Sequence, residues 1–420
     1  MRLIIDFDKF QTTFKQIESI MKQDKTLKSE TKTVVVYIGG TESSSEKDIP
    51  VFFRTKSIQM CQPLYCQDVE NSDDSMSIEL NVTEIISILN SFKSTLTPPS
   101  QVQIEFTYGS PNIMFTVFVP QESSIKGNAP INYFFNLKHT TPPSYIMEEF
   151  LSDMSNSEIK YSNVSLSDLT APLKALSEGY KYIPSHITSQ IYVRFNREYI
   201  YMRTAMGMIA YKNPTPVLQD INLLEDSVKI LGLVALSFSA VNLYNDEKRA
   251  KLYIQTGLGG GTIIFNYRTS YNEDDSLKGI FKLISSKETI TLSRQAFEQN
   301  FKRIPDDSSI LYFTRTRGTG KILCDISSRV MQSLMILNQI GDLVDQMVLK
   351  LKPIMIRSAL VPLTSSKSEI LRMHFGTQDH KTVTIAFTDD TNSWYSLISV
   401  SAIFGEDYYK TVQEYEKFKF

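Results

Sequence analysis

The sequence predicts an α+β fold built from three diverged copies of one unit: a short apolar strand, an amphipathic helix, several strands, a second amphipathic helix and further strands. In the first helix of each copy, apolar residues recur three and four positions apart, which gives one apolar stripe on a helix. These stripes are Phe7, Phe10, Phe14, Ile17 and Met21; Leu166, Leu169, Leu173, Leu176 and Tyr180; and Phe297, Phe301 and Ile304. Because hairpin-length connections cannot form parallel crossovers, we expect antiparallel strands.

The second helix of each copy is predicted to begin after an apolar residue followed by Asn. The three pairs are Leu80-Asn81, Ile221-Asn222 and Leu337-Asn338. Asn is a preferred N-cap because its side-chain oxygen accepts a hydrogen bond from an otherwise unpaired backbone N–H. Glu84 and Glu225 follow their Asn by three residues, which predicts capping boxes in the first two copies.

Runs of apolar and β-branched residues between these helices predict the strands, and the last two strands of the first copy should form a hairpin. The predicted strands are 33–38, 51–60, 76–80, 102–108 and 113–119; then 191–195, 199–204, 208–212, 251–256 and 262–268; then 289–292, 310–316, 321–326, 370–375, 383–388 and 394–400. Tyr408, Tyr409, Val412 and Tyr415 predict an amphipathic tail helix.

A chain of 420 residues fits two or three domains. We predict domains over 1–125, 161–270 and 271–405, with a C-terminal tail over 406–420. A polar, Pro-bearing segment over 126–160 is predicted to connect the first two domains.

Composition limits the function classes. A formal net charge of −2 argues against a protein that coats nucleic acid through bulk positive charge, but it leaves a local basic track open. No apolar run reaches the roughly 18 residues of a membrane span, and Asp6 and Asp8 interrupt the start of the chain where a signal peptide would continue its apolar core. Three cysteines imply no disulfide framework and favour a reducing, cytoplasmic setting.

The chemical motifs are better explained without catalysis. Gly257–Gly261 lacks the Lys-Ser/Thr of a P-loop and is followed by a strand, so we expect a hairpin turn. Cys61 and Cys66 have no second pair of zinc ligands and should be free thiols. His374 and His380 lack a carboxylate partner, so we expect no metal.

Acidic doublets fall in predicted turns, where Asp bonds to its local backbone, and we expect them to be solvated. They are Asp73-Asp74, Asp274-Asp275, Asp306-Asp307 and Asp389-Asp390. No Ser/His/Asp set, nucleophile elbow or kinase signature is present. We therefore expect a protein that is not an enzyme and needs no cofactor.

The polar faces of the helices carry cations in every copy. If the helices share one surface, these side chains would face phosphates without reading sequence. The set is Lys9, Lys15, Lys22, Lys93, Lys174, Lys181, Lys229, Arg294, Lys302, Arg303 and Lys350. The alternative is that any amphipathic helix has a charged outer face, and Glu18, Glu178 and Glu298 share these faces.

The order of these elements resembles the DNA sliding clamps of the three-domain bacterial β type, over almost the whole chain. Met1–Phe10 is similar to a clamp's opening strand and helix, and Ser77–Asn90 with Gln101–Phe106 looks like the second half of a clamp domain. In the third copy, Leu334–Met347 is similar to the same second half of a clamp domain. Arg203–Gly207 stands where the family has an Ala-Thr-Asp-Gly-like turn but lacks the Asp, which suggests a remote, viral or phage member.

The resemblance implies a homodimeric ring of six domains, with sheets outside and helices inside. Such a ring encircles double-stranded DNA without sequence preference, and it holds a polymerase and a clamp loader through short apolar peptides. Ring closure is expected between strand edges around Val102–Tyr108 and Ile310–Thr316.

By position in the family, the peptide pocket would lie between the second and third domains. Its walls would be Met206, Met208 and Ile209, and Leu397, Ile398 and Val400. The alternative is that these residues belong to the ordinary cores of two sheets.

Three other functions remain open at the level of sequence. One is an open, C-shaped viral processivity factor, although such a factor would use two clamp-like domains rather than three. Another is a viral β-rich structural or assembly protein, for which paired helices in every copy have no special purpose. A hydrolase or transferase would need a catalytic constellation that the sequence lacks.

Overall fold

The structure is a computed structural model. It describes residues 2–23, 27, 32–38, 47–55, 57–70, 76–93, 97–107, 110–120, 131–142, 148–149, 152–153, 160–183, 186, 190–204, 207–256, 261–269, 275–284, 289–302, 309–313, 319–325, 332–340, 347–379, 382–403 and 405–415.

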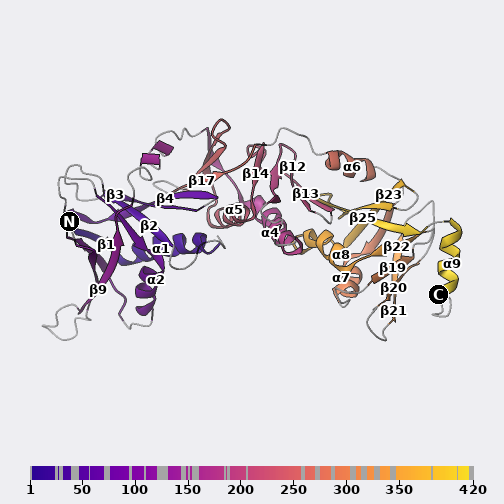
Figure 1. Cartoon of the computed structure of the whole chain (residues 1–420), viewed down its shortest axis with the longest axis horizontal. Helices are drawn as coiled ribbons and strands as arrows, with labels where there is room; N and C mark the ends of the chain where they lie inside the picture. Colours follow the sequence, from indigo (N-terminus) through magenta and orange to yellow (C-terminus); the bar gives the residue numbers. More distant parts are fainter. Residues whose placement is uncertain are drawn as a thin grey trace. The chain divides into compact units, whose positions relative to one another are not determined.

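The chain divides into two compact units, 1–167 with 233–267 and 168–232 with 268–420 (Figure 1). Unit 1 contains one 13-stranded antiparallel sheet with the order β10-β15-β16-β17-β4-β3-β2-β6-β9-β8-β7-β1-β5. Its elements are β1 (Arg2–Asp6), α1 (Phe7–Met21), β2 (Thr33–Ile38), β3 (Lys47–Arg54), β4 (Ile58–Cys66), β5 (Asp68–Glu70), β6 (Met76–Asn81), α2 (Val82–Ser91), β7 (Gln101–Phe106), β8 (Asn112–Val119), β9 (Ile131–Thr140), β10 (Tyr161–Val164), β15 (Val241–Asp246), β16 (Lys251–Thr256) and β17 (Thr262–Asn266).

Unit 2 contains a 12-stranded antiparallel sheet with the order β14-β11-β12-β13-β25-β22-β19-β20-β21-β18-β23-β24. Its elements are α4 (Thr170–Gly179), η3 (Tyr180–Tyr182), β11 (Val193–Phe195), β12 (Tyr199–Thr204), β13 (Gly207–Lys212), β14 (Ile221–Leu223), α6 (Asp275–Ile284), β18 (Thr289–Ser293), α7 (Arg294–Lys302), β19 (Ser309–Phe313), β20 (Thr319–Asp325), β21 (Gln332–Ile340), β22 (Val348–Leu351), α8 (Pro353–Ala359), η5 (Val361–Thr364), β23 (Ile370–Asp379), β24 (Thr382–Thr388), β25 (Trp394–Ile403) and α9 (Gly405–Tyr415). The chain passes between the units three times: in the short η2 (Ser167–Leu169), in the helix α5 (Glu225–Ser237), and between Tyr267 and Arg268.

The strand pairing repeats along the chain. Within residues 2–140, β1 pairs with β5 and β7, β2 with β3 and β6, β3 with β4, β8 with β7 and β9, and β6 with β9. Residues 289–403 repeat these pairings with eight strands, from β18 in the place of β1 to β25 in the place of β9, and the single strand β21 takes the places of both β4 and β5. Most of the pattern recurs between β10 and β17. The α+β fold with repeated two-helix units is therefore confirmed.

Neighbouring copies are joined by the same kind of strand pair. The last strand of the second copy, β17, pairs with β4 of the first, from Thr262↔Cys61 to Phe265↔Ile58. The last strand of the third copy, β25, pairs with β13 of the second, from Met208↔Leu397 to Tyr211↔Trp394. Each junction thus continues a sheet from one copy into the next.

Apolar stripes place the first helices as predicted. In α1 the stripe residues Phe10, Phe14 and Ile17 are fully buried, and the Asp6 side chain caps the helix by accepting from the Lys9 N–H at 3.0 Å. Asn81 caps α2, since its Oδ1 accepts from the N–H groups of Thr83 and Glu84 at 2.8 and 3.2 Å.

The other two predicted Asn caps are wrong. Asn222 lies in β14, where its side-chain Nδ2 donates to the Arg268 carbonyl at 2.7 Å, and α5 begins only at Glu225, so no capping box forms there. Asn338 lies inside β21, which pairs with β20 over its whole described length except the last two residues. The second helix of the third copy is α8, with Pro353 at its first position, where a missing N–H costs no hydrogen bond.

Two predicted segments differ from the structure. Residues 51–60 are not one strand: a turn separates β3 from β4, and Thr55 Oγ1 accepts from the N–H groups of Ser57 and Ile58 at 3.2 Å each. Residues 131–140, inside the predicted connector, form β9, which pairs with β8 and β6. The domain boundaries themselves stay predictions.

The strands predicted to close a ring are not edges, so that prediction is wrong. β7 lies between β1 and β8, and β19 lies between β20 and β22. Among the described strands, β9 pairs over residues 131–138 with β8 alone, and β21 pairs over 332–338 with β20 alone. These two stretches keep one unpaired edge each.

Candidate functional site

The first helices of the three copies place lysines at one equivalent position. When the apolar stripes are aligned, Phe14, Leu173 and Phe301 correspond, and the next residues are Lys15, Lys174 and Lys302. Seven residues further on, the first two copies again agree, with Lys22 and Lys181. At 100° per residue, a spacing of seven puts two side chains within about 20° of each other on a helix.

These lysines lie on exposed helix faces wherever their side chains are described. Lys15 and Lys174 are exposed, Lys22 pairs with Glu18 at 2.9 Å, and Lys181 pairs with Glu178. Exposed ion pairs of this kind are weak and exchange readily with other anions. Lys15 and Lys174 thus stand on the solvent-exposed faces of their helices.

The remaining predicted cations have other surroundings. Lys9 points elsewhere on α1, with its Nζ 3.7 Å from the centre of the Tyr65 ring. Lys93 is exposed just after α2, and Lys350 is exposed but lies in the strand β22, not in a helix. Lys229 is half-buried in an ion pair with Glu225. Arg303 and the side chain of Lys302 lie outside the described residues.

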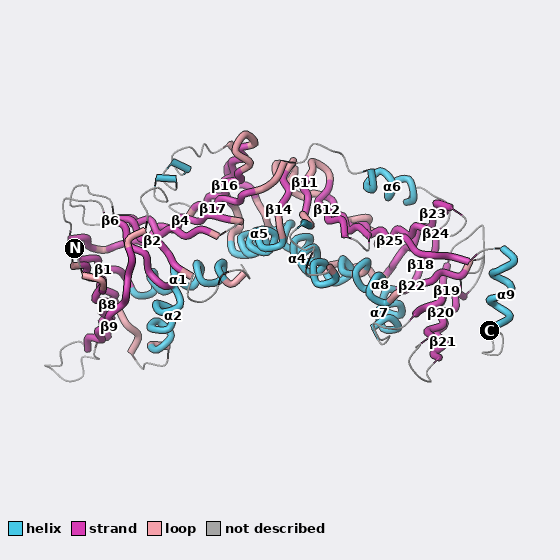
Figure 2. The backbone as a smooth tube through the Cα atoms, viewed as in Figure 1, coloured by secondary structure: helices cyan, strands magenta, loops and turns pink. Residues whose placement is uncertain are grey.

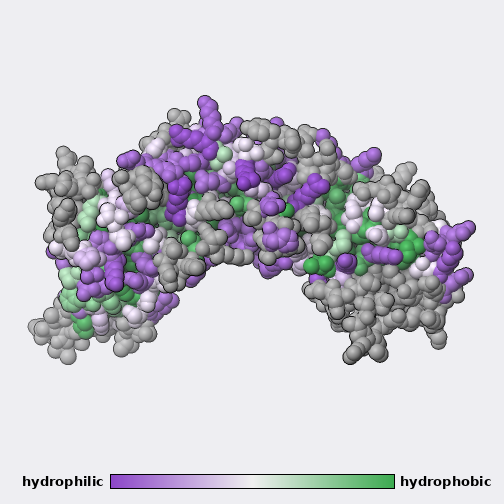
Figure 3. Space-filling model, viewed as in Figure 1, coloured by the Kyte–Doolittle hydropathy of each residue, from purple (hydrophilic) through white to green (hydrophobic). Residues whose placement is uncertain are grey.

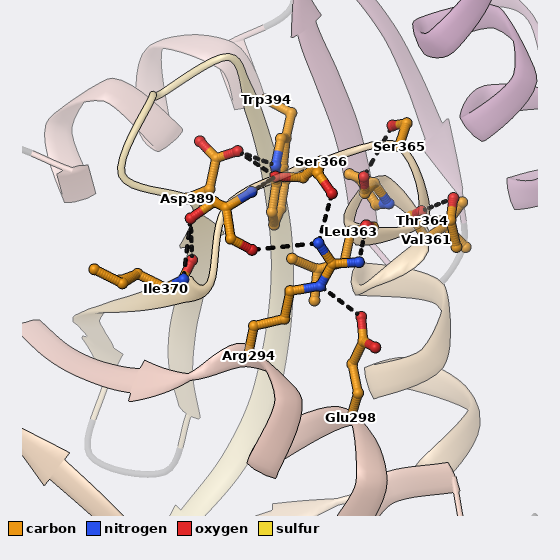
Figure 4. Close-up of polar contacts among 12 residues, drawn as sticks. Arg294, Glu298, Val361, Leu363, Thr364, Ser365, Ser366, Ile370, Asp389 and Trp394 are labelled. Carbon is orange, nitrogen blue, oxygen red and sulfur yellow. Dashed lines mark hydrogen bonds and ion pairs between the residues drawn. The ribbon is translucent and has the colours of Figure 1, made fainter.

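Arg294 is held by a set of polar contacts within unit 2. Its Nη1 donates to the carbonyls of Ser366 and Ser368 at 2.5 and 3.3 Å, and its Nη2 donates to the carbonyl of Leu363 at 2.5 Å (Figure 4). Its Nε pairs with Glu298 at 3.1 Å. These bonds tie the start of α7 to η5 and the turn that follows it, and η5 packs against α4.

Asp389 is the second centre of this network, and the prediction that its doublet is solvated is wrong for this residue. Asp389 is 1% exposed, and its Oδ2 accepts from Trp394 Nε1 at 2.9 Å and from Ser366 Oγ at 2.7 Å. Its Oδ1 accepts from the N–H and hydroxyl of Thr391 at 3.0 and 2.6 Å. Burial opposes ionisation, but these donors outweigh it and hold the pKa of Asp389 below its ordinary value of 3.8.

The junction of β13 and β25 has two different faces. Met208 and Ala210 point to one face together with Tyr395, Leu397 and Tyr201, and the helix α6 packs on it through Leu277, Ile280 and Phe281. Ile209 points to the opposite face, toward Gly179 at the end of α4. Figure 2 shows α6 on one side of these strands and α4 and α8 on the other.

The structure therefore brings together two of the six residues predicted for a peptide pocket. Met208 and Leu397 lie directly opposite each other under α6. Ile398 and Val400 alternate with Leu397 and pair with Ile385 and Val383 of β24, and both are buried. Met206 lies outside the described residues. Sequence reasoning missed α6, whose Leu277, Ile280 and Phe281 have the 3 and 1 spacing of a helical stripe.

Other predicted sites show no assembled chemistry. Cys61 and Cys66 are free thiols, and burial raises the pKa of each to about 12, for Cys66 with a further contribution from Asp48. His374 bonds to Thr289 Oγ1 through Nδ1 at 3.0 Å. In the described part of the chain, no three His, Cys, Asp or Glu side chains are grouped as a metal site, and no helix is long and apolar enough to span a membrane.

Several predicted residues lie outside the described ranges. They are Ile304, His380, Asp73, Asp74, Asp274, Asp306, Asp307 and most of Gly257–Gly261. The strands β16 and β17 on either side of that glycine run form an antiparallel pair with Gln255 opposite Thr262, as a hairpin requires.

Comparison with known proteins gives a match in structure alone. No protein-family model matches the sequence, and no curated protein matches it significantly. Solved structures do match, over 95% of this chain and 99% of theirs, and they are bacterial clamps. The fold is that of a β sliding clamp.

The similarity is long and remote. The sliding clamp of Pseudomonas aeruginosa, solved with a ligand, superposes with a TM-score of 0.66 at 9% identity. The DNA polymerase III β subunit of Borrelia burgdorferi gives 0.65 at 9%. The Helicobacter pylori β clamp bound to a DNA ligase peptide gives 0.60 at 10%. This chain thus has the β-clamp fold although its sequence is only 9–10% identical to those of these solved clamps.

Proposed function

We propose that this chain is a DNA sliding clamp, a processivity factor without enzymatic activity that encircles duplex DNA and tethers a polymerase. The observation that carries the proposal is the β-clamp fold over 95% of the chain, with all three copies of the unit in clamp order. The equivalent position of Lys15, Lys174 and Lys302 supports it, because a ring around a duplex needs the same contact from every copy.

The physics of sliding favours few, screened phosphate contacts. Directional bonds to bases would have to break at every step, whereas attraction between lysines and the phosphate backbone changes little as the duplex moves. At physiological salt, dissolved ions screen this attraction at distances beyond about 8–10 Å. A net charge of −2 is compatible with such a surface, because acidic residues elsewhere in the chain offset the lysines of the helices.

Ring closure is proposed to repeat the two junctions inside the chain. In both, the last strand of one copy pairs with the fourth strand of the copy before it, as β17 with β4 and β25 with β13. Applied between two protein chains, the same rule pairs β9 of one chain with β21 of the other. Among the described strands, β9 and β21 each keep an unpaired edge, and such edges tend to pair with another chain.

The surface of β9 agrees with this role. Ile131, Tyr133 and Phe134 are 42%, 40% and 63% exposed, an unusual set of exposed large hydrophobic residues on one strand. Figure 3 shows hydrophobic surface at the end of unit 1 where β9 lies. Two such β9–β21 contacts would close a head-to-tail homodimer. Each contact would pair the backbones of the two strands and bury the apolar side chains of β9.

Partner proteins are proposed to bind at the β13–β25 junction through short apolar peptides. One solved clamp with this fold is bound to a DNA ligase peptide. The face formed by Met208, Leu397 and their aromatic neighbours supplies apolar contact area of the kind that anchors such peptides. Polymerase and clamp loader are the expected partners, in the cytoplasm of a bacterial or virus-infected cell.

Retention on DNA tests the function directly. The protein would be loaded on nicked circular DNA by a cognate loader, or by transient opening in mild denaturant, and then passed through a sizing column. A clamp stays with the circle and is lost after a single restriction cut, because it runs off the free ends. Equal loss from circular and linear DNA would contradict encirclement and favour an open processivity factor.

A further inference from the structure

Helix α6 covers an apolar strip that crosses from the second copy of the unit to the third. The strip, defined as Tyr199, Tyr201, Met208, Tyr395 and Leu397, spans strands β12, β13 and β25. Ring centres of Tyr199 and Phe281 lie 4.9 Å apart, and those of Phe281 and Tyr395 lie 5.7 Å apart. With α6 in place, Tyr201, Met208 and Tyr395 are at most 6% exposed.

α6 is a weak helix when taken by itself. It has 10 residues, fewer than the roughly 12–15 that an isolated helix needs in water. Gly279 stands in its interior, where the lack of a side chain disfavours the helical state. The helix therefore depends on its packing against the sheet, both on β23 and β24 and on the strip, where Ile280 is fully buried.

The chain around α6 has the length to let it leave. Residues 270–274 precede the helix and 285–288 follow it, and stretches of this length reach roughly 13–18 Å when extended. Leu283 of α6 packs closely against Gly376 of β23, because a Cβ atom added at Gly376 would lie 1.9 Å from Leu283 Cδ2. Release of α6 therefore breaks side-chain contacts but no described strand pair.

We propose that α6 is a built-in occupant of the partner-peptide site, and that partners bind the strip by displacing it. The partner segment would be a short amphipathic peptide whose apolar anchors have the spacing of Leu277, Ile280 and Phe281. This inference rests on the proposed partner site. Because only the open fraction of the protein binds, the apparent dissociation constant equals the intrinsic constant divided by that fraction.

The first test uses a fluorescent synthetic peptide with the sequence of residues 274–285 as the probe, added to the full chain. Ile280→Ser in the protein weakens its own α6 and should tighten probe binding ten-fold or more. Gly279→Ala acts in the opposite direction. Alanine has a higher helix propensity than glycine, so this change stabilises α6 and should weaken probe binding about five-fold.

Lys278→Arg is the matched control, because Lys278 is exposed on α6 and the change keeps both its positive charge and the apolar stripe. It should leave probe affinity within two-fold of the wild type. Equal affinities for the wild type, Ile280→Ser and Gly279→Ala, or no binding by a folded Ile280→Ser variant, would overturn the proposal.

A second measurement needs no variant. Excess probe should accelerate hydrogen exchange of the α6 amides in the wild-type protein and leave those of β13 and β25 protected. Unchanged exchange in α6 at a probe concentration that saturates Ile280→Ser would also overturn it. Retention on circular DNA involves no peptide, so the proposed function and this inference fail in separate experiments.

Discussion

At the scale of single residues, two polar side chains that read as surface groups in the sequence stabilise the interior of unit 2. Arg294 donates to three carbonyls and Asp389 accepts from Trp394, Ser366 and Thr391. Their bonds connect α7, η5 and the turn between β24 and β25. Removing one partner of a buried, charged hydrogen bond leaves the others unsatisfied, which makes these residues sensitive to small changes.

Asp389→Asn should lower the free energy of unfolding by about 1–3 kcal/mol at pH 7, since the amide loses the charge that strengthens these bonds. The folded state holds the pKa of Asp389 below 3.8, so protons bind the unfolded state more readily. The stabilisation is therefore complete above pH 3.8 and is lost as the pH falls through the lower, folded pKa. Urea unfolding between pH 7 and pH 2.5 should show the two proteins converging; a constant difference would contradict this role.

Arg294→Lys should also destabilise the protein by about 1–3 kcal/mol, because one ammonium group cannot reach three carbonyls and Glu298 together. Thermal unfolding measures this loss. The slope of DNA affinity against salt should stay at the wild-type value, and a reduced slope would show that Arg294 contacts phosphate after all.

At the scale of elements, the equivalent position on the first helices decides which cations are worth testing. Lys15, Lys174 and Lys302 share it, whereas Lys229 and Arg294 are engaged in ion pairs and Lys350 lies in a strand. The apolar stripe fixes how each helix rotates on its sheet, and thereby fixes which residue stands at the outer face.

The triple change Lys15→Ala, Lys174→Ala and Lys302→Ala should weaken DNA binding and reduce the salt slope by about 0.9 for each lysine that contacts a phosphate. Folding should be unaffected, because exposed charges contribute little to stability. The matched control replaces Lys212, Lys248 and Lys410, which are exposed elsewhere, and removes the same charge. Equal salt slopes for both triple variants would show that only net charge matters.

At the scale of the whole molecule, the strand edges determine how copies assemble. Two junctions of the same kind occur inside the chain, and β9 and β21 are the strands left with free edges in the corresponding places. A homodimer follows if the third junction forms between chains.

Phe134→Lys places a charge on the exposed edge strand β9 and should convert a dimer of two 47.9-kDa chains to a monomer in light scattering at micromolar concentration. The residue is 63% exposed, so the monomer should fold normally. Leu236→Lys is the matched control, since Leu236 is a large hydrophobic residue that is 71% exposed on α5. A wild-type monomer, or a Phe134→Lys dimer, would contradict closure through β9.

The sequence by itself determined the local elements with strong periodicity. The stripe from Phe7 to Met21 predicted a helix where α1 lies, the runs 102–108 and 113–119 predicted the β7–β8 hairpin, and Tyr408 to Tyr415 predicted α9. Periodicity works there because one face of each element is buried and the other is not, so burial is written into the spacing of the residues.

Only the tertiary structure decided the features that depend on distant partners. Asn81 caps a helix while Asn222 and Asn338 lie in strands, because β11 and β20 supply the pairing that the local sequence cannot reveal. The burial of Asp389, the capture of Arg294 and the free edges of β9 and β21 likewise follow from which segments meet. A side chain's role depends on its neighbours in space, and a single sequence records only its neighbours along the chain.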